Sequence, residues 1–235
     1  MADVYGLRVI NPDGSVQIDE NYRNMQFITK QMVTVTRTDN NERFWYAEID
    51  TTDSTMYALR TVNTSGTVRF FCRIAQNKKL RIYALPKDTQ IEIYAFRFVP
   101  VTSVTGYGLV VSDTSGVIVF SSQEKYAKVK DVIAGVQADN LGETLKAART
   151  YNFKSAIVAN VCSTVYERIS QYNDDSLPFY EVYGDRYNVT SSFSGNNINV
   201  YSTPTLSSYW ESGQSDGFYR ECAGSPMLVL DVTNY

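Results

Sequence analysis

Hydrophobic and polar residues alternate along many short segments of this chain, with the period of two that is typical of half-buried β-strands. Turn-forming Asn, Asp, Gly and Pro residues separate these segments at close spacing, which indicates a sandwich or barrel. The expected strands cover residues 33–36, 43–49, 80–85, 91–98, 126–133, 179–183, 198–201 and 226–232. We therefore expect an all-β fold of hairpin-rich antiparallel sheets, with at most one or two short helices.

Two segments do not follow this alternation clearly. In residues 139–149, Asp139 or Asn140 can cap a helix built from Leu, Lys, Ala and Arg, so a short helix is predicted there, although Gly142 disfavours it. In residues 156–169, the apolar positions fit one face of a helix and also one face of a strand. The many β-branched residues of this second segment favour a strand.

One strand–turn–strand pattern occurs twice and begins each time with Tyr-Gly-Leu. It spans residues 5–18, with Asn11 and Gly14 in the turn, and residues 107–120, with Asp113 and Gly116 in the turn. An Asx side chain can accept a hydrogen bond from the backbone two residues on, and glycine can adopt the left-handed conformation that closes such a turn. A third, looser copy covers residues 57–70 and lacks the glycine after its tyrosine.

The two strong copies predict two β-sandwich-like modules, each of which opens with this hairpin. The segment 100–106 follows a predicted strand, contains Pro and Gly, and precedes the second copy, so we place a border near residue 102. Residues 1–102 are expected to form an N-terminal module that docks to an assembly, and residues 103–235 a C-terminal module.

The charge pattern argues against nucleic acid as a partner. The chain has 22 basic and 25 acidic residues, mixed along its length, and a formal net charge of −3. No long basic run could neutralise phosphates, and we expect the short cluster 78–81 to form a solvated turn and an edge strand. No apolar run is long enough to span a bilayer, and three widely spaced cysteines without an export signal indicate synthesis in a reducing cytoplasm.

No motif in the sequence specifies catalysis, a cofactor or a metal. Histidine is absent, which removes Ser-His-Asp and Cys-His catalysis, histidine zinc sites and the usual general base. The glycine-rich nucleotide-binding motifs are missing as well. Two carboxylate pairs, Asp50 with Asp53 and Asp174 with Asp175, keep a glycosidase as an alternative, although loop carboxylates of this kind are usually solvated. We expect a protein that is not an enzyme.

The segment 207–219 combines aromatic residues with Ser, Gly and Asp, a composition that is typical of binding loops. Its candidate binding residues are Tyr209, Trp210, Phe218 and Tyr219, whose rings could stack on sugars. In the alternative interpretation, Trp210 and Phe218 turn inward and seal one end of a sandwich.

The Tyr-Gly-Leu hairpins, with their Asx-x-x-Gly turns, and the closing run 228–232 resemble small structural proteins of the tail tip of long-tailed bacteriophages. The resemblance implies a non-enzymatic virion component of the tail tip or baseplate, made in the host cytoplasm. Its partners would be other tail proteins near the host-facing end, and copies of itself in three- or six-fold symmetry. A module that binds a receptor or a carbohydrate of the host surface through residues 207–219 is the alternative function.

Overall fold

The computed structural model describes residues 9–10, 16–18, 24–38, 43–52, 55–62, 67–74, 78–99, 101, 104–134, 136–138, 142–158, 164–172, 181–206, 210–212, 219–220 and 226–235. Within these ranges the chain forms strands and no helix, and all the strand pairs are antiparallel. The all-β fold predicted from the sequence is therefore confirmed.

The strands follow one another in this order: β1 (Val9–Ile10), β2 (Val16–Ile18), β3 (Gln26–Thr34), β4 (Arg37–Thr38), β5 (Trp45–Asp50), β6 (Thr55–Thr61), β7 (Arg69–Ile74), β8 (Lys79–Leu85), β9 (Gln90–Arg97), β10 (Val110–Ser112), β11 (Ile118–Ser121), β12 (Val129–Ile133), β13 (Thr144–Thr150), β14 (Ser155–Val158), β15 (Thr164–Tyr172), β16 (Glu181–Ser194), β17 (Asn197–Leu206), β18 (Trp210–Ser212), β19 (Tyr219–Arg220) and β20 (Met227–Asp231).

Most of these strands belong to two large sheets. A six-stranded sheet has the order β12-β20-β14-β6-β9-β3, and a ten-stranded sheet has the path β13-β17-β16-β7-β8-β5-β4, with β15, β18 and β19 beside this path. Each sheet contains strands from both sides of residue 102, since β14 pairs with β6 and β16 pairs with β7. The expected border near residue 102 therefore does not divide the large sheets, because backbone pairing joins strands across it.

One apolar core lies between the two large sheets. The six-stranded sheet contributes Leu59, Ile91 and Ile93 among others, and the ten-stranded sheet contributes Ile82 and Phe193 among others. The period of two is visible in β9, where the odd-numbered isoleucines face this core and the even-numbered aromatic residues face the other side of the sheet. Burial of these side chains is the main term that holds the sheets together.

The outer face of the six-stranded sheet is covered by the C-terminal residues. The ring of Tyr235 lies 5.0 Å from that of Phe27 and 5.5 Å from that of Phe96. Its hydroxyl donates a hydrogen bond to the carbonyl of Tyr126, and Lys125 Nζ donates to the carbonyl of Asn234 at 2.6 Å. The last residues of the chain are thus tied to the six-stranded sheet.

A buried arginine connects the two sheets. Arg60 is only 6% exposed and donates to the carbonyl of Ser155 in β14 and to the carbonyl of Gly195, each at 2.7 Å. Gly195 lies in the turn between β16 and β17 and has a φ of +60°. The guanidinium also stacks on the ring of Phe193, 4.8 Å from its centroid. Burial lowers the pKa of Arg60 from its ordinary value.

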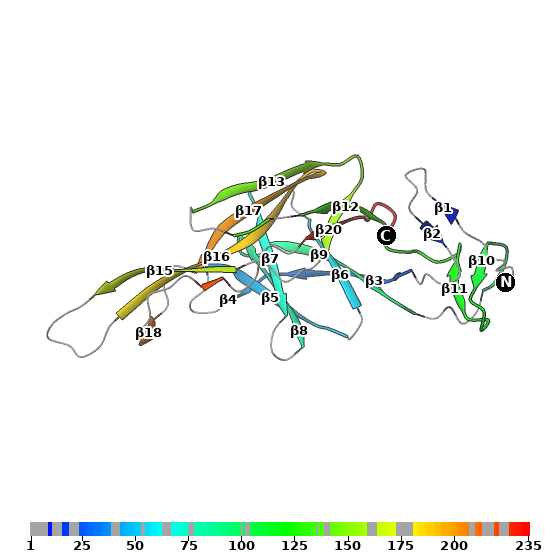
Figure 1. The fold of residues 1–235 in the computed structure, drawn as a ribbon, viewed down its shortest axis with the longest axis horizontal. Coiled ribbons are helices and arrows are strands. Elements are labelled where there is room, and N and C mark those ends of the chain that lie inside the picture. The colour runs from blue at the N-terminus through cyan, green and yellow to red at the C-terminus, as the bar shows by residue number, and fades with distance from the viewer. Residues whose placement is uncertain are drawn as a thin grey trace, which may run out of the picture.

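The molecule is long, with different elements at its two ends (Figure 1). The hairpins β1–β2 and β10–β11, which contain the two strong Tyr-Gly-Leu copies, lie at one end and form separate two-stranded sheets. At the opposite end, β15 and the first part of β16 extend away from the rest as an arm, together with β18. We call these regions the hairpin end and the arm.

Two expectations about local structure are wrong, and one is confirmed. The segment predicted as a helix, 139–149, contains the edge strand β13, because pairing with β17 overrides the helix propensity of its residues. The third copy of the repeat is not a hairpin, since β6 and β7 belong to different sheets. The strand favoured for 156–169 is confirmed in β14 and β15, and residues 159–163 lie outside the described ranges.

Candidate interaction surfaces

The turn of the β10–β11 hairpin is closed by Asp113 and Gly116. Asp113 Oδ1 accepts hydrogen bonds from the backbone N–H groups of Ser115 and Val117, both at 2.9 Å, and from the Ser115 hydroxyl at 2.6 Å. Gly116 donates to the Asp113 carbonyl at 3.0 Å and has a φ of +83°, which favours glycine. The equivalent turn residues of the first copy, Asn11 and Gly14, lie outside the described ranges.

The segment before β10 is held rigidly and exposes a tyrosine. Ser122 Oγ accepts a hydrogen bond from the N–H of Leu109 at 2.9 Å, and a Cβ at Gly108 would lie 2.6 Å from this oxygen. The glycine of Tyr-Gly-Leu is therefore needed for close approach of the two segments. Gln123 also donates to the carbonyls of Thr105 and Tyr107. The Tyr107 side chain is fully exposed on this fixed backbone.

Other large apolar side chains are exposed near Tyr107. Leu109 is 44% exposed and Val110 is 38% exposed. The buried apolar residues of this hairpin are Val111 and Val119, with Phe120 packed against them. A pre-organised aromatic residue beside exposed aliphatic residues is typical of a protein interface. The hairpin end is thus the first candidate interaction surface.

The candidate aromatic segment 207–219 belongs to the arm. Trp210 lies in β18 and Tyr219 in β19, whereas Tyr209 and Phe218 lie outside the described ranges. The register pairs Trp210 with Tyr183 of β16, and Tyr219 with Tyr166 of β15. Because β15 and β16 pair with each other, β18 and β19 flank this hairpin on opposite edges.

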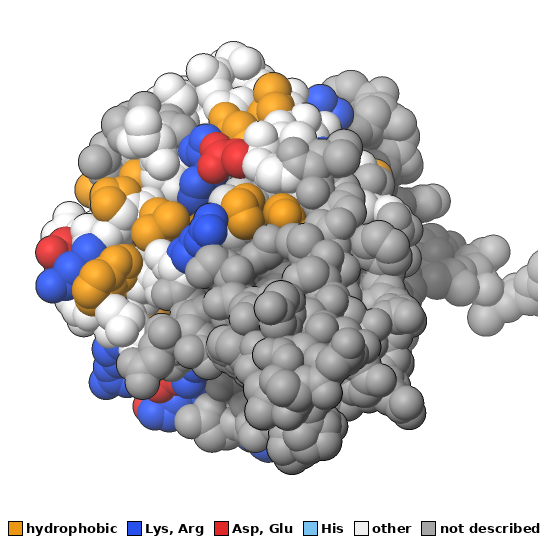
Figure 2. Space-filling view, turned by 90° about the vertical axis from the view of Figure 1, so that its left-hand side faces the viewer, with side chains coloured by type: hydrophobic (Ala, Val, Ile, Leu, Met, Phe, Trp, Pro, Cys, Tyr) orange, Lys and Arg blue, Asp and Glu red, His pale blue; other side chains and the backbone are white. Residues whose placement is uncertain are grey.

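The arm is the second candidate interaction surface. Sequence patterns indicated the aromatic composition of 207–219, but not its partners in β15 and β16, which are distant in the sequence. The backbone of Trp210 is paired with a strand rather than placed in an irregular loop. Seen from the arm end, the described surface has hydrophobic and basic side chains next to one another (Figure 2).

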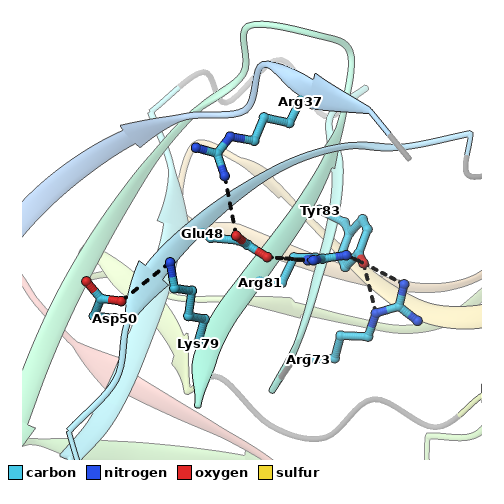
Figure 3. A network of polar contacts seen from close by, with 7 residues as sticks. All are labelled: Arg37, Glu48, Asp50, Arg73, Lys79, Arg81 and Tyr83. Atoms are coloured by element: carbon cyan, nitrogen blue, oxygen red, sulfur yellow. Dashed lines mark hydrogen bonds and ion pairs between the residues drawn. The ribbon is translucent and has the colours of Figure 1, made fainter. Parts of the chain in front are cut away.

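A charged and aromatic network covers part of the outer face of the ten-stranded sheet (Figure 3). Glu48 accepts from Arg81, with an Nη2–Oε1 distance of 2.6 Å, and from Arg37 at 3.3 Å. Arg73 donates to the hydroxyl of Tyr83 through Nε at 2.9 Å. The hydrogen bond from Arg81 lowers the pKa of Glu48 from its ordinary value, although burial opposes this effect.

This network stabilises the pairing of three strands. The Arg81 guanidinium lies 4.4 Å from the centroid of the Tyr46 ring, and the Tyr83 and Phe71 rings stack at 4.6 Å. These residues come from β5, β7 and β8, so the contacts run across adjacent strands. The expectation of an edge strand at 78–81 is wrong, because β8 lies between β5 and β7 in the interior of the sheet.

A second charged cluster lies on the six-stranded sheet. Glu92 accepts from Lys30, Lys154 and the hydroxyl of Tyr94, each at 2.7 Å. Burial raises the pKa of Glu92, but these three hydrogen bonds outweigh the effect of burial and lower the pKa to about 2. Burial and the adjacent carboxylate raise the pKa of Tyr94. The groups satisfy one another, which is typical of a structural cluster.

Of the carboxylates considered for glycoside hydrolysis, only Asp50 lies in the described part of the chain. Asp50 is largely exposed and lies 3.6 Å from Lys79, and Asp53, Asp174 and Asp175 lie outside the described ranges. Among the residues that the structure describes, no group of three or more Cys, Asp or Glu could hold a metal ion. In the same residues, no helix is long and apolar enough to cross a membrane.

Comparisons with known proteins give no relative of this chain: no family model, no curated protein and no solved structure matches it.

Proposed function

We propose that this chain is a non-enzymatic structural protein of a virion, in the tail tip or baseplate of a long-tailed bacteriophage. In this proposal it is made in the host cytoplasm and packs against other tail proteins near the host-facing end. Copies of the chain are related by three- or six-fold symmetry, as most tail assemblies require closed rotational symmetry.

The observation that carries the proposal is the pair of Tyr-Gly-Leu hairpins. Both form two-stranded sheets outside the large sheets, and both lie at the same end of the molecule. An isolated two-stranded hairpin is marginally stable in water, so such hairpins are useful where another surface supports them. The exposed Tyr107, Leu109 and Val110 provide apolar area for that contact. The sequence resemblance to tail-tip proteins rests on the same hairpins.

The test is mass spectrometry of purified particles from a lysate in which this chain is produced. We expect the chain in intact tails, in fixed stoichiometry with the other tail proteins and after washing at high salt. Tail-less capsids from the same lysate are the control, and they should lack the chain. If the chain occurs only in the soluble fraction, the proposal is overturned.

A second candidate function, binding of a host surface glycan or protein, has support from the arm. Trp210 and Tyr219 lie on strands that flank opposite edges of the β15–β16 hairpin, Trp210 opposite Tyr183 and Tyr219 opposite Tyr166. The arm extends at the end of the molecule away from the hairpin end. In this case, Trp210→Ala would abolish binding to host cells while the melting temperature stays unchanged. Tyr107→Ser, at the other end, is the matched control and should bind normally. Equal binding by both variants would exclude the arm as the receptor site.

A further inference from the structure

The edges of the two large sheets are protected against pairing with another chain. The terminal strands of the six-stranded sheet and of the main path of the ten-stranded sheet each contain a basic residue: Lys30 in β3, Lys130 in β12, Lys146 in β13 and Arg37 in β4. The strand β3 also has a bulge between Phe27 and Thr29. Charged residues and bulges are the usual means of preventing edge-to-edge association.

The hairpins lack this protection. The strands β1, β2, β10 and β11 contain no charged residue, and residues 98–112 are uncharged throughout. In the described part of the chain, β1 and β2 pair only with each other and β10 pairs only with β11, whereas Ile118 of β11 also forms a single antiparallel bridge with Val101. The outer edge of β10 is therefore an uncharged strand edge that has no third strand beside it in the described residues.

The backbone of β10 offers hydrogen-bonding groups on its open edge. Ser122 N–H donates to the Leu109 carbonyl at 2.9 Å, so Leu109 directs its backbone groups toward β11. The next residue, Val110, lies opposite Ser121, and antiparallel alternation directs its N–H and carbonyl away from β11. A further strand can pair there without disturbing the hairpin.

We propose that this edge is an interface between copies of the chain, in which β10 pairs with the β1–β2 hairpin of a second copy. An uncharged edge suits an uncharged partner strand, and β1–β2 has this character together with the same Tyr-Gly-Leu pattern. Each copy then uses two different surfaces, which is the arrangement that closes into a ring. The inference rests on the proposed function only for the place where the oligomer acts; the evidence for the interface is the uncharged edge of β10.

The experiment measures the molar mass of the purified full chain by light scattering and sedimentation over a wide concentration range. We expect a closed oligomer of three or six copies for the natural sequence. Val110→Pro removes the outward N–H and leaves the hydrogen bonds of the hairpin intact, since proline is tolerated on such edges. We expect it to raise the dissociation constant at least tenfold, on the order of the effect of one or two lost hydrogen bonds.

Two further variants separate this effect from misfolding. Val110→Lys keeps the backbone N–H but adds the charge that protects the other edges, and it should also dissociate the oligomer. Met32→Lys introduces the same charge at a residue 57% exposed on β3, and it should leave the oligomer intact. Circular dichroism melting of each variant should match the natural chain, because the core between the large sheets is unchanged.

Several results would overturn the inference. These are a monomer at all concentrations, a dimer as the final state, an oligomer that survives both Val110 variants, or dissociation by Met32→Lys. A monomeric chain that is nevertheless found in washed tails would remove this interface and leave the proposed function standing. An oligomer that depends on Val110 but never enters virions would support this interface and overturn the proposed function.

Discussion

The outer faces of the two large sheets differ in how they are covered. On the six-stranded sheet, the C-terminal Tyr235 packs on Phe27 and Phe96, and Glu92 is held by three groups at 2.7 Å. On the ten-stranded sheet, Glu48 has two cationic partners, one of which, Arg37, is 62% exposed and 3.3 Å away. Glu92 thus has three partners at one short distance, whereas the Glu48 network includes one partner that is largely exposed and more distant. We call the first side sealed and the second side open.

This difference indicates where the free energy of folding is concentrated. Charged groups contribute most where several short hydrogen bonds satisfy them and water is partly excluded. Ion pairs that include an exposed partner contribute little, because water and salt screen them. Substitutions on the sealed side should therefore cost more stability than equivalent substitutions on the open side.

The largest expected effect follows from Arg60, the cross-strand partner of Glu92. Arg60→Ala leaves the carbonyls of Ser155 and Gly195 without their charged donor, so we expect a loss of about 3 kcal/mol in the free energy of unfolding. Urea denaturation measures it, with Arg37→Ala on the open face as the control. A loss below that of the control would contradict the role of Arg60 as a link between the sheets.

Removal of the aromatic cover should have the next largest effect. Tyr235→Ala removes the ring contacts with Phe27 and Phe96 and exposes this part of the sheet, at an expected cost of about 2 kcal/mol. Tyr46→Ala is the matched control, since this tyrosine lies on the open face under Arg81. The melting temperature should fall less for the control than for Tyr235→Ala. Equal decreases would show that the cover formed by Tyr235 adds no more stability than Tyr46 does on the open face.

Glu92 should determine part of the response to acid. Its folded pKa of about 2 lies below the ordinary value of 4.5, so its stabilisation is complete above 4.5 and is lost as the pH falls toward 2. Glu92→Gln should lower the free energy of unfolding by about 1–2 kcal/mol at neutral pH, after allowance for partial solvent screening. Below pH 3 the variant and the natural chain should converge; a constant difference down to pH 2 would exclude this explanation.

The smallest effect is expected for the corresponding carboxylate of the open face. Glu48→Gln should cost below about 1 kcal/mol, because one partner is exposed and screened by solvent. High salt should reduce the loss in the free energy of unfolding more strongly for Glu48→Gln than for Glu92→Gln. Urea titrations at low and high ionic strength measure both values, and a larger loss for Glu48→Gln would reverse the comparison.

The sequence predicted the strands well and their neighbours poorly. Alternation identified β5, β8, β9 and β20 closely, because it records which residues face water. It does not record how many strands lie beside a given strand, and so β8, with its three basic residues nearby, was expected at an edge although it lies inside a sheet. The failed helix at 139–149 has the same origin, since pairing with β17 is not visible locally.

The candidate surfaces were predicted in part. Turn chemistry identified Asp113 and Gly116, whose hydrogen bonds involve only neighbouring residues. The same chemistry did not distinguish the looser copy at 57–70, whose strands β6 and β7 lie in different sheets, because sheet membership depends on distant strands. The partners of Trp210 and Tyr219 in the arm depend on long-range register, which one sequence does not contain.

The position of β20 has a consequence for the order of events during synthesis. This strand, Met227–Asp231, lies between β12 and β14, and β14 in turn lies beside β6. The six-stranded sheet can therefore not close until residues 227–231 have left the ribosome. Pairing of strands so distant in sequence is slow. Until β20 is available, the strands already synthesised have unpaired edges that can aggregate. Efficient production of this protein should thus depend on slow growth or on chaperones that shield the nascent chain.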